Sequence, residues 1–280
     1  MKQLSYVFLL LLGLALRPTG AQAQTTDSLS QKLTSIFANI DKSQVPTRYL
    51  YEAGVRFLPL SYYNGTLSDS NRTDMNVLRY LHAQLLSSRV YGDDTLPSLP
   101  AFNARLQAVR TASNGAIPLA IEYHPYASIR PDAIQNNLLR VQNEQVFDVA
   151  GRSFTPYETN KLFVAAPEQG YAPTNTVSFL FRRNLYLTSD GSAPLNLYLD
   201  FDDGRGYQPA TWGQPLSTTY GTAGLKRVKV KAYFGWQTLE SHFDFNVQSV
   251  AVAARYDPAY GFIAHFGPGN QKPGATVSVR

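Results

Sequence analysis

Apolar and polar residues alternate through most of the chain from Pro156 to residue 248. The alternating runs are rich in β-branched and aromatic residues, and clusters of Gly, Pro, Asn and Asp separate them at short intervals. A period of two puts every second side chain on one face of a strand, and many short strands with turns between them are typical of an antiparallel β-sandwich. We therefore predict strands within KLFVAAP (161–167), TVSFLFRRNLYLTS (176–189), APLNLYLDF (193–201), LKRVKVKAYFG (225–235) and HFDFNVQSVAVAARY (242–256).

The preceding part of the chain has a different period. Apolar residues recur at helical spacing in segments 27–41 and 70–90, and more weakly in 100–112, which predicts three helices. An extended segment at 116–129 and short strands within 136–154 follow. The predicted fold is thus an α+β N-terminal region (24–155), an all-β, immunoglobulin-like sandwich (156–248) and a strand-rich C-terminal tail (249–280).

The first 23 residues predict export. Lys2 precedes an apolar run from Tyr6 to Leu16, and Ala21-Gln22-Ala23 has the small-x-small pattern of a signal-peptidase site.

Cleavage would remove Lys2 and Arg17 and leave 23 basic and 20 acidic residues, a formal charge of +3. This excess is too small to indicate nucleic-acid binding. The chain has no cysteine, which excludes a disulfide scaffold, and no further apolar run long enough to span a membrane. We expect a bacterial protein that is secreted or located in the cell envelope.

The stretch LYLDFDDGRGYQPATW (197–212) places three aspartates within four positions, followed by glycines and aromatic residues. The chain resembles the PKD (polycystic kidney disease) domain over residues 160–248. The resemblance lies in the order of four features: a strand ending at Phe201, this turn, a later tyrosine and a closing strand. That family carries Trp-Asp-Phe-Gly-Asp-Gly, then His-x-Tyr, then Pro-Gly-x-Tyr-x-Val. The matching residues are Asp200, Phe201, Asp203, Gly204, Tyr220, Gly224 and Val228, and the departures are Leu199, Asp202, Thr218 and Lys226.

The resemblance implies an immunoglobulin-like sandwich in which the aspartates first serve the turn. Asp203 would accept a backbone hydrogen bond, and Phe201 and Tyr220 would fill the space between the sheets. Asp200, Asp202 and Asp203 also offer oxygen ligands for calcium, which some related domains bind, although Thr211 excludes an EF-hand loop. Acid–base catalysis by these carboxylates is a third alternative, and the turn is the favoured one.

Histidine and glutamate provide a weaker metal signal. Glu122 and His124 are two apart in an extended segment, so their side chains should share a strand face, and such a pair can bind zinc, but no third ligand is visible. His82 lies within a predicted helix, has Leu86 rather than a ligand at i+4, and is interpreted as a surface or core-edge residue. His242 is interpreted as part of an exposed polar strand face.

No catalytic motif occurs in the sequence: it lacks a Gly-x-Ser-x-Gly elbow, His-Glu-x-x-His, a phosphate loop and a dinucleotide fingerprint. Tyr207 and Trp212 follow the aspartates in a turn-rich segment, where platforms for stacking sugars are often found. We therefore predict a non-catalytic binding or structural module that contacts glycans or envelope proteins and needs no cofactor, with calcium the one candidate ion. The alternative is an accessory region of a larger exported hydrolase, because PKD-like domains commonly accompany such enzymes.

Overall fold

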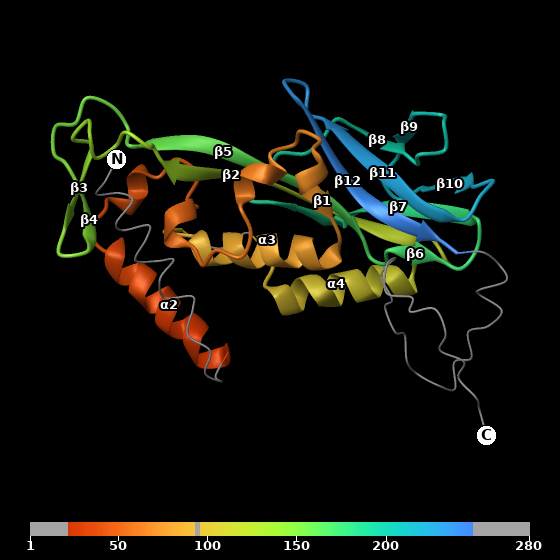
Figure 1. The fold of residues 1–280 in the computed structure, drawn as a ribbon, viewed down its shortest axis with the longest axis horizontal. Coiled ribbons are helices and arrows are strands. Elements are labelled where there is room, and N and C mark those ends of the chain that lie inside the picture. Colours follow the sequence, from red (N-terminus) through yellow and green to blue (C-terminus); the bar gives the residue numbers. More distant parts are fainter. Residues whose placement is uncertain (1–21, 93–95, 249–280) are drawn as a thin grey trace, which may run out of the picture.

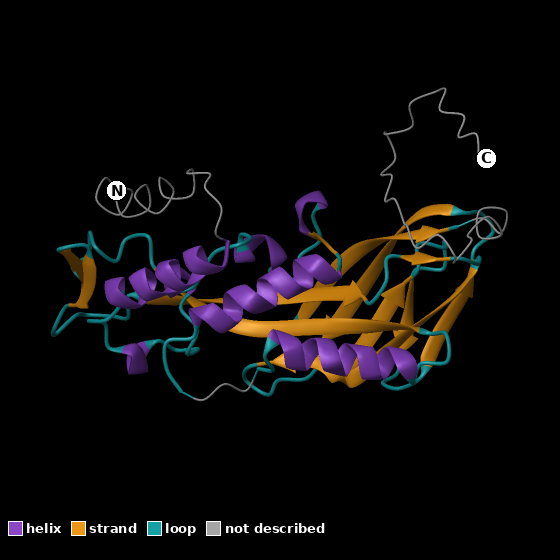
Figure 2. Cartoon of the chain, turned by 90° about the horizontal axis from the view of Figure 1, so that it is seen from below, coloured by secondary structure: helices purple, strands orange, loops and turns teal. Residues whose placement is uncertain are grey.

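The computed structural model describes residues 22–92 and 96–248, and strands predominate among them, as the sequence predicts (Figure 1). The signal-peptide prediction lies almost wholly outside the described residues, and the predicted C-terminal tail, 249–280, lies wholly outside them. Two larger sheets and a set of helices form three layers, and a small hairpin lies at one end (Figures 1 and 2).

The larger sheet has six strands in the order β1-β12-β11-β8-β9, with β6 also pairing with β12. The two short strands β1 and β6 run parallel to β12, and the other neighbours are antiparallel. The bounds are β1 (Arg72–Thr73), β6 (Tyr171–Ala172), β8 (Asn196–Asp200), β9 (Tyr207–Ala210), β11 (Gly224–Tyr233) and β12 (Thr238–Val247).

The second sheet has four strands in the order β10-β7-β2-β5. Its β2 runs antiparallel to β5 and parallel to β7, and therefore lies inside the sheet. The predicted boundary at residues 155/156 thus falls between two neighbouring strands of one sheet, β2 before it and β5 after it. The bounds are β2 (Ile117–Ile129), β5 (Tyr157–Pro167), β7 (Thr176–Thr188) and β10 (Pro215–Thr219).

Three α-helices occur among the described residues, close to the predicted positions. Helix α2 begins five residues before the predicted start at Asp27. Helix α3 begins at Met75, and the preceding Asp74 caps it: Asp74 Oδ1 accepts hydrogen bonds from the N–H groups of Asn76 and Val77, both at 2.8 Å. The bounds are α2 (Gln22–Ile36), α3 (Met75–Ser88) and α4 (Leu99–Thr111), with short 3-10 turns at η1 (Lys42–Gln44), η2 (Tyr51–Ala53), η3 (Leu60–Tyr63) and η4 (Asp69–Asn71). None of the described helices is both long and apolar enough to cross a membrane.

Apolar side chains fill both faces of the four-stranded sheet. One face packs against the six-stranded sheet, with Phe179, Phe201, Phe243 and Phe245 at its centre. The other face packs against α3 and α4 (Figure 2). Because β2 lies between these two cores, its residues from Ile117 to His124 are all buried.

The end of the molecule distant from the six-stranded sheet has a third core. Helix α2 packs there against the hairpin of β3 (Leu139–Gln142) and β4 (Gln145–Asp148), two of the short strands predicted within 136–154, which turns at Asn143-Glu144 (Figure 1). Both turn residues have positive φ, a conformation that asparagine tolerates better than most residues.

Candidate functional site

The three aspartates of the predicted turn lie at the end of β8 and bond mainly to neighbouring protein groups. Asp200 Oδ1 accepts the N–H of Asp202 at 2.9 Å, and its Oδ2 lies 3.2 Å from the ammonium of Lys229. Asp202 has a positive φ of 61° and accepts the N–H of Arg227 at 3.0 Å. The turn thus ties the end of β8 to the neighbouring strand β11.

Asp203 has the densest set of partners in this turn. Its Oδ1 accepts the N–H of Arg205, which confirms the predicted backbone hydrogen bond, and its Oδ2 accepts the guanidinium of Arg205 at 2.6 Å and the hydroxyl of Thr218 at 2.8 Å. Burial acts to raise the pKa of the Asp203 carboxyl, but these hydrogen bonds outweigh burial and hold the pKa below its ordinary value. Calcium binding by Asp200, Asp202 and Asp203 stays a prediction.

Tyr220 joins the turn to the core between the sheets. Phe201 and Tyr220 are both buried, as predicted, and the Tyr220 hydroxyl donates to the carbonyl of Phe201 at 2.8 Å. We expect Tyr220→Phe to lower the free energy of unfolding by about 1–2 kcal/mol, because a buried carbonyl loses its partner. Urea unfolding would measure this loss. Tyr233→Phe is the matched control, since Tyr233 also donates to a carbonyl but is 38% exposed; an equal loss in both variants would contradict the prediction.

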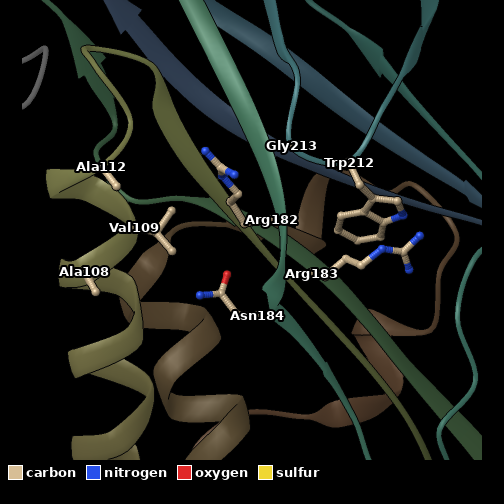
Figure 3. Close-up of a pocket in the computed structure, with 8 residues that line it drawn as sticks. All are labelled: Ala108, Val109, Ala112, Arg182, Arg183, Asn184, Trp212 and Gly213. Atoms are coloured by element: carbon tan, nitrogen blue, oxygen red, sulfur yellow. The ribbon is translucent and has the colours of Figure 1, made fainter.

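The two predicted ligand-binding aromatics are not brought together. Tyr207 lies in β9, where its hydroxyl donates to Glu240 at 2.7 Å and the Lys231 ammonium lies 3.7 Å from the centre of its ring. Trp212 lines an open pocket of about 560 Å³ between α4 and β7 (Figure 3). The other lining residues are Ala108, Val109, Ala112, Arg182, Arg183, Asn184 and Gly213.

An irregularity in β7 builds this pocket. Leu119 of β2 pairs with Phe181, but Ile121, two residues later, pairs with Tyr186. Residues 182–185 therefore bulge from the sheet opposite Ala120. Figure 3 shows Arg183 beside the indole of Trp212 and Arg182 on the side of α4.

The pocket combines positive charge with an aromatic ring. The guanidinium carbon of Arg183 lies 5.3 Å from the centre of the Trp212 ring, which also packs edge-on against Phe181 and Tyr186. Among the described residues, no carboxylate lies within ion-pair distance of Arg182 or Arg183. Two guanidinium groups are thus available to an anionic ligand.

Comparison with known proteins identifies no relative. No family model, curated protein or solved structure matches this chain.

A second group of functional side chains lies in the core between α3 and β2. Glu122 Oε1 lies 2.7 Å from Nδ1 of His82 and 2.9 Å from Nε2 of His124, and all three side chains are fully buried. Among the described residues, this is the group of three potential metal ligands whose atoms all lie within 4.8 Å of one another. The interpretation of His82 as a surface or core-edge residue is therefore wrong: it is the third member that the pair on β2 lacked.

The environment of Glu122 favours its ionised form. Burial acts to raise the pKa of the carboxyl, but the two adjacent histidines outweigh burial and hold the pKa below its ordinary value. Nothing in the sequence near His82 indicated this contact, because 40 residues separate it from Glu122. Burial excludes substrate from the group, so we assign it no catalytic role.

The interpretation of His242 as an exposed residue is also wrong. Strand β12 lies inside the six-stranded sheet, and the imidazole is buried, with Nε2 2.8 Å from the carbonyl of Ser68 and 3.0 Å from Oδ1 of Asn71. The neighbouring residue on that strand face, Asp244, pairs with Arg72 at 2.8 Å. These contacts attach the segment 68–73 to the edge of the sheet.

Proposed function

We propose that this chain is an exported, non-catalytic binding module that recognises acidic glycans through the pocket at Trp212. The apolar leader with Ala21-x-Ala23 supports export, and the absence of catalytic motifs from the sequence supports binding without turnover. The observation that carries the proposal is the presence of Arg182 and Arg183 in the lining of one open pocket that Trp212 also lines.

The chemistry of the pocket fits a sugar that carries a carboxylate or sulfate. An indole offers a flat apolar surface to the C–H face of a sugar ring, and guanidinium groups bind carboxylates in a bidentate geometry. Asn184 adds an amide that can donate to and accept from hydroxyl groups. An uncharged glycan would leave both guanidinium groups without an anionic partner.

We further propose that the two facing sheets form a divergent PKD-like, immunoglobulin-like sandwich. The turn at Asp203-Gly204, the buried Tyr220 and the alternating strand β11 support this assignment, and Val228 and Val230 of β11 are buried in the core between the sheets. The sandwich would take its strand β2 from the segment that precedes the region of resemblance.

The binding proposal predicts that removal of one pocket arginine weakens the binding of an acidic oligosaccharide. We expect Arg182→Gln and Arg183→Gln each to raise the Kd for an oligogalacturonate about tenfold, because a hydrogen bond to a charged group contributes about 1.5 kcal/mol. Titration calorimetry would measure the Kd, and quenching of tryptophan fluorescence would report on Trp212.

Two controls make the experiment specific. Arg105→Gln removes an exposed arginine from α4 outside the pocket, and should leave the Kd within about twofold. Trp236→Phe removes the other tryptophan, which is 69% exposed, and should leave the quenching unchanged. The proposal fails if no acidic oligosaccharide binds at millimolar concentration, or if a neutral one of equal length binds as tightly.

A further inference from the structure

The hydrogen-bond geometry of His82 requires a positive charge or a shared proton beside Glu122. The carbonyl of Pro97 lies 2.7 Å from Nε2 of His82, and a carbonyl only accepts, so Nε2 carries a hydrogen. In the neutral ring Nδ1 then presents a lone pair, and it faces Oε1 of Glu122 at 2.7 Å. Two lone pairs at this distance repel, so a proton or a cation lies between them.

A proton between His82 and Glu122 would leave the group incompletely satisfied. The second oxygen of Glu122, Oε2, and the Nδ1 of His124 are buried and have no hydrogen-bond partner among the described residues. Each such atom costs about 1–3 kcal/mol. A cation bound by both oxygens of Glu122 would satisfy Oε2 and would leave only Nδ1 of His124 without a partner.

The available donor atoms match those of a zinc site. His82 Nδ1, His124 Nε2 and one oxygen of Glu122 provide three ligand atoms of the kinds that zinc prefers, and the second oxygen of Glu122, which has no hydrogen-bond partner among the described residues, can provide a fourth. Zinc bonds of about 2.0–2.1 Å at near-tetrahedral angles place a histidine nitrogen and a carboxylate oxygen about 3.4 Å apart. The nitrogen–oxygen distances of 2.7 and 2.9 Å need to open by about 0.7 and 0.5 Å, which small side-chain rotations allow.

The hydrogen bond from His82 to Pro97 is also typical of a metal ligand. A metal-bound histidine usually donates its other ring N–H to a carbonyl or carboxylate, which fixes the tautomer and the orientation of the ring. In His82 this partner is already present, and Nδ1 is the nitrogen that faces Glu122.

We propose that His82, Glu122 and His124 bind one zinc ion in a closed structural site that joins α3 to β2. All three side chains are fully buried, so the site has no position open to substrate, as is usual for structural zinc. The ion would join elements 40 residues apart in the sequence, within the core that also holds Phe102 of α4, whose ring centre lies 5.8 Å from that of His82.

Metal analysis of the full chain tests the proposal. We expect the protein purified from zinc-containing medium to hold one zinc per chain after dialysis. Removal of zinc by a chelator should lower Tm by about 5–10 °C relative to protein in free zinc about a hundredfold above its Kd. Substitution by cobalt should give the visible absorption bands of a four-coordinate ion.

Matched variants attribute the ion to these residues. Glu122→Gln and His124→Gln should lose the zinc and the zinc-dependent shift of Tm. His242→Gln removes another buried histidine with two hydrogen-bond partners, and should retain both. If a variant fails to fold, nitrogen-15 NMR of the wild-type imidazoles can identify the ligands instead. Zinc binding should change the chemical shifts of Nδ1 of His82 and Nε2 of His124. Absence of zinc binding by the wild-type chain, or equal binding by folded Glu122→Gln, would overturn the proposal.

Discussion

Phe179→Ala should lower the free energy of unfolding by about 3–5 kcal/mol and Tm by about 10 °C. The Phe179 ring is fully buried between the two large sheets, and its centre lies 5.9, 5.6 and 5.1 Å from those of Phe201, Phe243 and Phe245. Truncation would remove these contacts and leave a cavity that strands from both sheets surround, which limits how far the site can collapse. Urea unfolding followed by tryptophan fluorescence, with calorimetry for Tm, would measure the loss.

Leu225→Ala is the control for this substitution. Leu225 is also an apolar residue in a strand, but it is 63% exposed, so its truncation should change stability by less than about 0.5 kcal/mol. A loss below about 1.5 kcal/mol for Phe179→Ala would show that the two sheets do not pack through this ring.

The free energy of unfolding of the wild-type protein should fall between pH 5 and pH 8, and Glu52→Gln should abolish this fall. Burial raises the pKa of Glu52 to about 7, from an ordinary value of 4.5, even though its Oε2 accepts the N–H of Ile129. Between these two pKa values the folded chain binds more protons than the unfolded chain, so stability is greatest below pH 4.5 and declines as pH rises through 7. The shift corresponds to roughly 3 kcal/mol, and urea unfolding at pH 5 and pH 8 would measure it.

The difference between wild type and variant isolates Glu52 from the other titrating groups. Burial lowers the pKa of His242, so its contribution has the opposite sign and increases as pH rises toward 6.5. Glutamine keeps an oxygen that can accept from Ile129 but cannot ionise. Glu144→Gln, at the exposed turn between β3 and β4, should leave the pH dependence unchanged. Parallel pH profiles for wild type and Glu52→Gln would disprove the assignment.

Local sequence patterns predicted most of the individual elements. The helices α3 and α4 and the main strands after Pro156 have periodic apolar residues and nearby caps or turn residues, and all of these signals are contained within a few positions. Burial of Val228 and Val230 followed from alternation alone. The β7 bulge also left a local signal, because Arg182-Arg183-Asn184 interrupts the alternation with three consecutive polar residues.

Long-range pairing accounts for what the sequence did not predict. Glu122 and His124 were placed correctly on one strand face, but a strand pattern does not reveal that helix α3 supplies His82 to that face. The burial of His242 likewise depends on segment 68–73, which pairs with β12 from far along the chain. Contacts of this kind arise from topology, and a single sequence contains no periodic signal for them.

The parallel pairing of β1 with β12 has a consequence for how the chain folds. Arg72 lies opposite His242, which follows it by 170 positions (242 − 72), and the inner strand β2 must likewise await β5 and β7. Loop closure over such separations is slow, and chains dominated by non-local pairing fold correspondingly late. The segment around β1 therefore acquires its native partner only after the last described strand has been synthesised, so the edge of the six-stranded sheet is among the last parts of the fold to form.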